Sequence, residues 1–360
     1  SIGTKSRMSS YLLVRVAFGD KGAGLVNIAF AVSLLGWFGI NINLFADAVS
    51  RLAFDLWGLE LPGLGLAVFA SVCMTLTTLI GFKAINILAS LLVPVLAFVT
   101  YLLAASALKT QSFAQILATE KTATLSLGEG ISAVVGAIII GAIILPDVSR
   151  FVRHWSGAVY TAIISYLIVQ LAVMAAAGLS GAVSGKTDIL DIMIDLNLGV
   201  GAFIIVIAGI WVLNSLNLYS AVLGTKATFP NINSKVLTLG LATLGVGAAL
   251  MNILDSFVMF LFYLSVIFVP VAGVIMVDFL LIRPKSYVID TLTNNRAFNV
   301  KGFAAWSAGA LFAVLGSEAL IPTLTGAAAL DAMILSAVIY AVISWAERVK
   351  HNNSAKNSAL

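Results

Sequence analysis

The chain has 360 residues, of which 61% are hydrophobic and only 10% charged, and its mean hydropathy is +1.07. Soluble domains carry roughly 25% charged and 45–50% apolar residues, so this chain requires lipid as its solvent. The net charge of +4 does not indicate nucleic-acid binding, because the basic residues lie in loops between apolar runs. The single cysteine, Cys73, excludes an intramolecular disulfide and a cysteine metal cluster.

Long apolar runs without alternation predict membrane-spanning helices and exclude the strands of a membrane barrel. A spanning helix needs about 20 apolar residues, and ten runs approach or reach that length. The predicted fold class is therefore an all-α integral membrane protein. The ten predicted spans cover residues 22–46, 61–82, 84–108, 130–147, 157–182, 198–224, 234–253, 255–282, 302–317 and 327–346.

The basic residues are distributed unevenly when these spans alternate across a bilayer. Of the 20 Lys and Arg residues, all fall on one side except Arg51, Lys109, Lys121 and Lys186. The side richer in Lys and Arg is cytoplasmic. We therefore expect a multi-pass protein of the plasma (inner) membrane with both ends of the chain in the cytoplasm. We expect the polar tail, residues 347–360, to be disordered.

The first predicted span contains an aromatic residue near its middle. Trp37 stands between Gly36 and Gly39, away from the interface where tryptophan is usually found. A flat ring flanked by glycines can form the floor of a pocket for a planar ligand. Packing between helices through small residues is the alternative interpretation.

Two glycines, Gly136 and Gly141, interrupt the span at residues 130–147. Transporters bind substrate near the middle of the bilayer at unwound helices, where backbone groups become free. These glycines therefore indicate either an approach of the backbone to a ligand or close helix packing.

The span at residues 198–224 is the most polar at depth. Asn214, Ser215 and Asn217 lie within one turn, and they cannot all face lipid without cost. A carboxamide both donates and accepts hydrogen bonds, so it can pair with the edge of a heterocycle. A hydrogen bond between helices is the alternative.

The span at residues 255–282 contains a proline that should kink it. Pro270 removes a backbone hydrogen bond, and Gly273 follows, so we expect a gate here. At the inner end Asp278 precedes Arg283, and a structural ion pair is favoured over a proton relay.

We do not expect an enzyme. The two histidines, His154 and His351, lie in polar segments, and the sequence shows no Ser/His/Asp set, metal cluster or phosphate-binding loop.

The order and spacing of these motifs resemble the nucleobase:cation symporter family, the purine/cytosine permease group, and most closely its bacterial cytosine-permease branch. The matching stretches are residues 12–19 with 21–22, 36–39, 136–147 with 150–151, Trp211 with Asn214 and 218–219, and Pro270, Gly273, Asp278 and Arg283.

The resemblance implies the leucine-transporter fold, in which two inverted five-helix repeats are followed by two extra helices. It aligns the first span here with the family's third helix. The chain is then expected to lack the first two helices and to hold helices three to twelve. Residues 1–360 would form one transmembrane transporter domain. Its expected parts are 22–108 (the rest of the first repeat), 130–282 (the second repeat), 302–346 (the extra helices) and 347–360 (a cytoplasmic tail).

The resemblance also implies a substrate site. The substrate ring would stack on Trp37, and Asn214 would hydrogen-bond its heteroatoms. The other expected lining residues are Ser33, Leu34, Ala137, Ile138 and Ser215. The cytosine-like branch has a Gln where this chain has Leu34, an aromatic residue at Ile138 and a Ser at Ile140. The pocket is therefore more aliphatic. Cytosine, another pyrimidine, a purine, a hydantoin or allantoin, or a thiamine precursor all remain open.

A cation site is implied at Ile205, Ala208 and Gly209, which would contribute backbone carbonyls because they have no side-chain oxygen. The coupling ion is then sodium or a proton, and no other cofactor is expected.

The predicted function is cation-coupled uptake of a nucleobase or related small heterocycle by alternating access. The alternatives are a symporter of the same fold for amino acids or osmolytes, and a membrane receptor that does not transport. The expected partners are a small-molecule substrate and the lipid bilayer, without nucleic acid, and the oligomeric state is left open.

Overall fold

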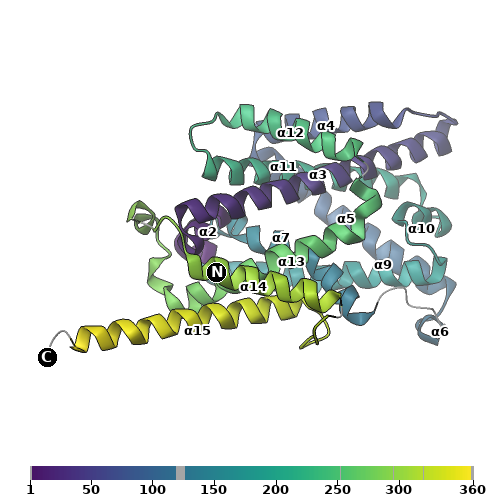
Figure 1. Ribbon diagram of the computed structural model, residues 1–360. Helices are drawn as coiled ribbons and strands as arrows, with labels where there is room; N and C mark the ends of the chain where they lie inside the picture. The colour runs from purple at the N-terminus through teal and green to yellow at the C-terminus, as the bar shows by residue number, and fades with distance from the viewer. Residues whose placement is uncertain (1, 119–125, 252, 295, 319, 358–360) are drawn as a thin grey trace. The chain divides into compact units, whose positions relative to one another are not determined.

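The computed structural model describes residues 2–118, 126–251, 253–294, 296–318 and 320–357. Within these ranges the chain is helical apart from its connections, and no strand occurs (Figure 1). Nine helices of the described chain are long and apolar enough to cross a membrane. The predicted span at 234–253 forms helix α12 (Ser234–Leu250), which has only 17 residues. It is therefore shorter than predicted and stands at the lower limit of about 17–25 residues for a spanning helix.

The chain folds into two compact units that interleave along the sequence. Unit 1 holds Ser1–Phe30, Ala123–Ala158 and Ser256–Leu360, and unit 2 holds Ala31–Thr122 and Val159–Asp255. Two helices, α3 (Asp20–Trp57) and α8 (Trp155–Ala162), contribute residues to both units. The inverted repeats expected from the sequence are a different division of the chain and stay a prediction.

Unit 1 is built around α13, which packs against α7, α14 and α15. Figure 1 shows α14 and α15 side by side. The helices are α1 (Ile2–Ser6), α2 (Ser10–Phe18), α7 (Leu127–Ser149), α13 (Phe257–Val277), α14 (Val300–Ser317) and α15 (Ala328–Asn357). A π-helical turn at Asp278–Ile282 and 3-10 turns at Pro284–Ser286 and Ile289–Asn294 join α13 to α14.

The last helix is longer than predicted. Helix α15 continues to Asn357, so the prediction of a disordered tail is wrong as far as that residue. A formed helix gains one hydrogen bond for each residue that it adds, so it can extend into a polar sequence beyond its apolar part.

Small residues bring the helices of unit 1 into close contact. A Cβ atom at Gly136 would lie 2.1 Å from the carbonyl oxygen of Leu261, and one at Gly273 would lie 2.5 Å from Ser336 Oγ. Helix α7 is continuous through Gly136 and Gly141. Of the two alternatives left open for these glycines, the contact at Gly136 fits close helix packing.

The expected gate residues also pack within unit 1. Helix α13 is α-helical on both sides of Pro270, whose carbonyl accepts a hydrogen bond from Ser336 Oγ at 3.1 Å. Gly273 faces α15 through the same serine. Whether this helix gates transport stays a prediction.

A buried carboxylate closes the end of α13. Asp278 accepts hydrogen bonds from Arg283 Nη2 (2.9 Å) and Nε (3.1 Å), Tyr287 Oη (2.7 Å) and Tyr340 Oη (2.6 Å). The predicted structural ion pair is confirmed. Burial and the negative charge of Asp278 raise the pKa of Tyr287 well above its ordinary value, so this hydroxyl stays protonated and donates.

The same region holds the C-terminal end of α2. Arg283 Nη2 donates to the carbonyl of Val16 (2.6 Å), and Asn299 Nδ2 donates to that of Ala17 (2.7 Å). The last carbonyls of a helix lack partners within it, and these side chains supply them. Gly19 follows in the left-handed half of backbone space, with φ +84°.

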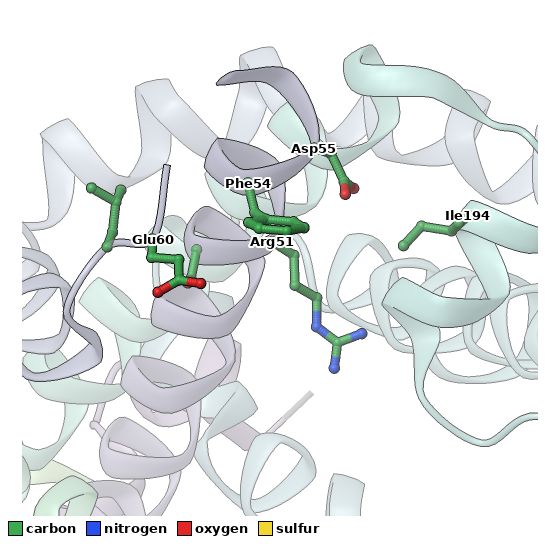
Figure 2. A pocket seen from close by; sticks show the side chains of 7 residues that line it. Arg51, Phe54, Asp55, Glu60 and Ile194 are labelled. Atoms are coloured by element: carbon green, nitrogen blue, oxygen red, sulfur yellow. The ribbon is translucent and has the colours of Figure 1, made fainter. Parts of the chain in front are cut away.

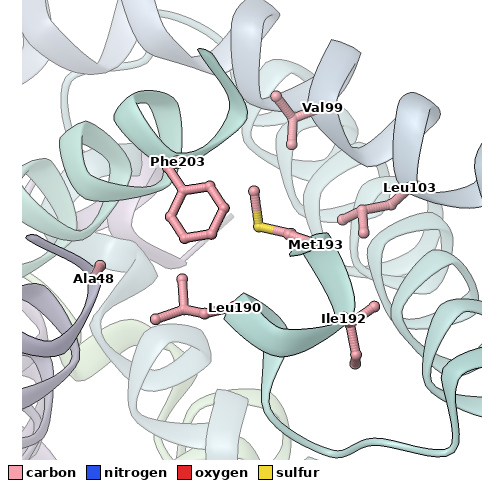
Figure 3. Close-up of a cluster of buried hydrophobic side chains, with 7 residues drawn as sticks. All are labelled: Ala48, Val99, Leu103, Leu190, Ile192, Met193 and Phe203. Atoms are coloured by element: carbon pink, nitrogen blue, oxygen red, sulfur yellow. The ribbon is translucent and has the colours of Figure 1, made fainter. Parts of the chain in front are cut away.

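Unit 2 is built around α11, which packs against α4, α5 and α12. Its helices are α4 (Gly63–Ile80), α5 (Phe82–Thr110), α6 (Phe113–Ala118), α9 (Gln170–Ser184), α10 (Ile189–Asp195), α11 (Gly199–Thr228) and α12. It also contains a π-helical segment at Ile163–Val169, and the 3-10 turn at Ile253–Ser256 begins in unit 2 and ends in unit 1. An apolar cluster joins α3, α5, α10 and α11 at one end of unit 2 (Figure 3). Met193 and Phe203 lie at its centre.

We predict that Gly136→Ala destabilises the protein, because the added methyl group would collide with the backbone of α13. Overpacking typically costs about 1–3 kcal/mol. The matched control is Gly178→Ala on α9, where nothing lies within 4 Å of the added carbon. Thermal unfolding in detergent should show a lower midpoint for Gly136→Ala and an unchanged or higher one for Gly178→Ala. Equal midpoints would contradict the packing described here.

Candidate functional site

One face of α3 carries the predicted aromatic platform. Ser33, Trp37 and Asn41 are spaced four residues apart, so they lie on the same side of the helix. Ser33 and Asn41 are buried, and Trp37 is half-buried. The neighbouring Phe38 lies against α12, where a Cβ atom at Gly245 would be 2.4 Å from its ring.

Asn214 of α11 connects this face of α3 to α4. Its Nδ2 donates to the carbonyl of Phe38 (3.1 Å) and to Met74 Sδ (3.1 Å), while Asn41 Nδ2 donates to its Oδ1 (3.3 Å). The side chain is fully buried. Both amide hydrogens and one acceptor position are therefore used, and a ligand would meet the remaining lone pair of Oδ1 or displace one of these bonds.

More polar contacts continue along the same interface. Trp211 Nε1 donates to Thr77 Oγ1 (3.0 Å), and Thr78 Oγ1 lies 3.1 Å from the carbonyl of Ser215. Ser215 is fully buried. These threonines were not among the predicted site residues. The sequence does contain a signal for them, because the polar residues Thr75, Thr77 and Thr78 lie together within an apolar span.

The predicted substrate residues are divided between the units. Ser33, Leu34, Trp37, Asn214 and Ser215 all belong to unit 2. Leu34 is buried on α3 beside the residues above. Ala137 and Ile138, both half-buried, belong to α7 of unit 1. The structure therefore brings Asn214 to the helix that carries Trp37, and the meeting of this group with α7 stays a prediction.

The predicted cation ligands lie inside a continuous helix. Ile205, Ala208 and Gly209 belong to α11, where each carbonyl faces the N–H group four residues further along. A Cβ atom at Gly209 would lie 3.1 Å from Leu96, so this position packs against α5. Among the described residues, no three or more His, Cys, Asp or Glu side chains are grouped to hold a metal. Cation binding at these carbonyls stays a prediction.

Each unit also contains a cavity that was not predicted from the sequence. In unit 1, a cavity of about 350 Å³ is lined mainly by apolar side chains of α7 and α13, together with Ser10 and Pro146. In unit 2, one of about 430 Å³ is lined by Arg51, Asp55 and Glu60 together with four further residues (Figure 2). Neither cavity is lined by a predicted substrate residue.

Arg51 also links α3 to α10. It forms ion pairs with Asp191 and, at 3.5 Å, with Asp188. All three side chains are more than a third exposed, so the pairs hold these two elements together only weakly.

Comparison with protein families matches residues 1–340 to the family described as permease for cytosine/purines, uracil, thiamine and allantoin. Among individual proteins, the cytosine permeases of Escherichia coli strain K12 and of Escherichia coli O157:H7 are each 29% identical to the chain over 285 residues. The match covers 78% of this chain and 66% of each relative, just under two thirds of their length.

Two solved structures have a similar fold. Mhp1, a nucleobase-cation-symport-1 family transporter, was solved in a closed conformation with bromovinylhydantoin bound. It matches with a TM-score of 0.76 and 19% identity, over 97% of this chain and 81% of that one. Its inward-facing conformation matches with a TM-score of 0.73 and 18% identity over the same shares. The predicted fold class, a leucine-transporter-like helix bundle, is confirmed.

We predict a graded loss of stability when the bonds around Asn214 are removed. Asn214→Ala removes three interhelical contacts, whereas Asn41→Ala removes only one of them. Interhelical hydrogen bonds in membranes average about 0.6 kcal/mol, so the losses should be about 2 and about 0.6 kcal/mol. Reversible unfolding in mixed micelles measures both. A larger loss for Asn41→Ala than for Asn214→Ala would show that Asn214 is not the centre of these contacts.

Proposed function

The chain belongs to the family of permeases for cytosine/purines, uracil, thiamine and allantoin, and we propose that it imports a nucleobase or related heterocycle together with a cation. Transport is secondary active and proceeds by alternating access, with sodium or a proton as the coupling ion. We place the protein in the plasma membrane with both ends of this chain in the cytoplasm. The excess of Lys and Arg in the predicted cytoplasmic loops supports this orientation.

The observation that carries the proposal is the bond between Asn214 and the backbone of α3 next to Trp37. It holds a carboxamide beside the helix that presents a half-buried indole. A planar heterocycle needs an aromatic surface for its face and a donor–acceptor group for its edge. Cytosine, in the relatives' name, and a hydantoin, bound to Mhp1, both have flat rings with N–H and C=O groups at the edge.

The aliphatic side chains expected around this pair favour a broad range of substrates. Leu34 is buried on α3, and Ile138 lies on α7. Apolar walls discriminate ring sizes by only about 1–3 kcal/mol for each methylene group, whereas hydrogen-bonding groups discriminate strongly. We therefore assign specificity to the pattern of donors and acceptors on the substrate, read by Asn214, and we leave the ring type open among pyrimidines, purines, hydantoins and thiamine precursors.

Two substitutions in the full-length protein test this site. Trp37→Ala and Asn214→Ala should each reduce saturable uptake of the heterocycle to background, because one removes the stacking surface and the other removes the edge contact. Asn41→Ala breaks the same Asn41–Asn214 bond but keeps the carboxamide, so it should retain uptake. The exposed Trp345 provides a second control, and Trp345→Ala should transport normally. Normal uptake by both site variants, at equal amounts in the membrane, would refute the assignment.

A thermal-shift screen of the full-length protein identifies the substrate class. A ligand present at about 100 times its Kd stabilises the folded state by about 2.7 kcal/mol. Cytosine, uracil, a purine, a hydantoin, thiamine and amino acids are compared, each with and without sodium. Stabilisation by amino acids and by no heterocycle would replace the proposal with the amino-acid alternative.

A further inference from the structure

Unit 1 contains three buried aspartates, and two of them are fully hydrogen-bonded. The four bonds to Asp278 are described above. Asp331 accepts from Leu324 N (2.8 Å) through one oxygen, and from Thr325 N (2.9 Å) and Thr325 Oγ1 (2.7 Å) through the other. Both oxygens of each of these carboxylates accept hydrogen bonds, so neither buried oxygen is left without a donor. These two aspartates therefore have structural roles.

The third, Asp147, is bonded on one side only. It lies near the C-terminal end of α7 with 7% of its surface exposed. Its Oδ1 accepts from Ser10 N (2.7 Å) and Ser10 Oγ (3.0 Å). Its Oδ2 is buried and has no hydrogen-bond partner among the described residues. A buried oxygen without a donor costs about 1–3 kcal/mol, and more when it is charged.

The charged groups around Asp147 leave it without an ion pair in the described part of the chain. Arg150 is the cation that acts on it, but Arg150 Nε donates to the backbone carbonyl of Asp147 (3.2 Å), and its guanidinium lies over the ring of Phe151. Arg7, between α1 and α2, donates to the carbonyls of Arg150 and Val152.

Other elements packed on α7 add little charge near it. From α2, Tyr11 interacts electrostatically with Asp147, and Arg15 pairs with Asp20. Lys5 of α1 is exposed. Helix α13 has no charged residue, and Asp278 after it and Asp331 of α15 are bonded as described. Further along α15, Glu347 bonds to Lys301 and Arg348 to the carbonyl of Ile282. Lys350 and Lys356 follow near the end of the same helix.

This arrangement accommodates Asp147 both with and without its charge. Ser10 is the first residue of α2, so the backbone N–H that bonds Oδ1 belongs to a helix N-terminus, which favours an anion. At Oδ2 no donor is present, and addition of a proton would remove the charge without breaking a bond. Ionisable residues within membrane spans commonly belong to ion pathways and proton relays.

We propose that Asp147 is the proton-binding residue of this transporter, and that the coupling cation is a proton. The inference rests on the transport function proposed above and selects between its two candidate ions. In one state of the cycle Oδ2 takes a proton from a hydronium ion, so an O–H bond forms and a water molecule is released. In the other state it returns that proton to water. Ser10 positions the carboxylate through Oδ1 in both states.

The test uses the full-length protein in liposomes, with labelled cytosine, uracil and a hydantoin in parallel. Counterflow exchange, which needs no ion gradient, reports the transport cycle, and accumulation driven by a pH gradient reports coupling. One proton for each substrate gives accumulation of about tenfold for each pH unit. Asp147→Asn, which carries no titratable proton, should keep exchange and lose accumulation.

The matched control is Asp331→Asn, a buried carboxylate of the same unit. It should lose thermal stability but keep both exchange and proton-driven accumulation. A second variant, Ser10→Ala, removes one donor to Oδ1 and keeps the backbone N–H. The lost hydrogen bond stabilises the charged form of Asp147 more than its protonated form. Without it Asp147 should hold its proton up to a higher pH, so the pH at half-maximal uptake should rise.

The outcomes separate the two proposals. If the unmodified protein exchanges none of the three substrates, the proposed function fails. If it exchanges and Asp147→Asn still accumulates substrate with a pH gradient, or if only a sodium gradient drives accumulation, the proton site is wrong. If Asp147→Asn also loses exchange, the Ser10→Ala variant provides the test. An unchanged pH at half-maximal uptake in that variant would overturn the assignment of Asp147 as the proton-binding residue.

Discussion

The absence of water inside a bilayer is the constraint on which the rest of this structure depends. A polar group within the hydrocarbon region must find its partner in the protein. The chain meets this requirement by gathering polar side chains where helices touch. The carboxamide of Asn214 on α11 forms hydrogen bonds with residues of α3 and α4. At the end of α13, Asp278 accepts four hydrogen bonds. Five buried side-chain atoms of the described residues lack a partner, and Oδ2 of Asp147 is the one among them that belongs to a carboxylate.

Most of the architecture could be predicted because length and apolarity decide whether a segment spans a membrane. The ion pair between Asp278 and Arg283 was also predictable, since a short connection keeps the two residues close. Composition does not reveal where a helix stops, so α12 ends earlier and α15 later than predicted. Gly136 shows a second limit. Glycine permits both an unwound backbone and a close helix contact, and only the carbonyl of Leu261 beside it distinguishes the two.

The candidate site was predictable in part, for a similar reason. Helical spacing places Trp37 and Asn41 on one face of α3, but it does not give the rotation of α3 against another helix. Asn214 was therefore found as a polar residue at depth, whereas its partners Asn41 and Met74 were not. Ala137 and Ile138 were assigned by resemblance alone, and they lie in the other unit of the fold.

Helix α2 is bonded at or near its two ends to groups that hold two of the three buried aspartates of unit 1. Its first residue, Ser10, donates to Asp147. Near its other end, Arg283 donates to the carbonyl of Val16 and also to Asp278. Asn299 donates to the carbonyl of Ala17. The helix has nine residues and is about 13 Å long. Both aspartates are therefore tied by hydrogen bonds to the same short helix. The proposed protonation of Oδ2 would thus occur beside a helix whose opposite end is bonded to the connection between α13 and α14.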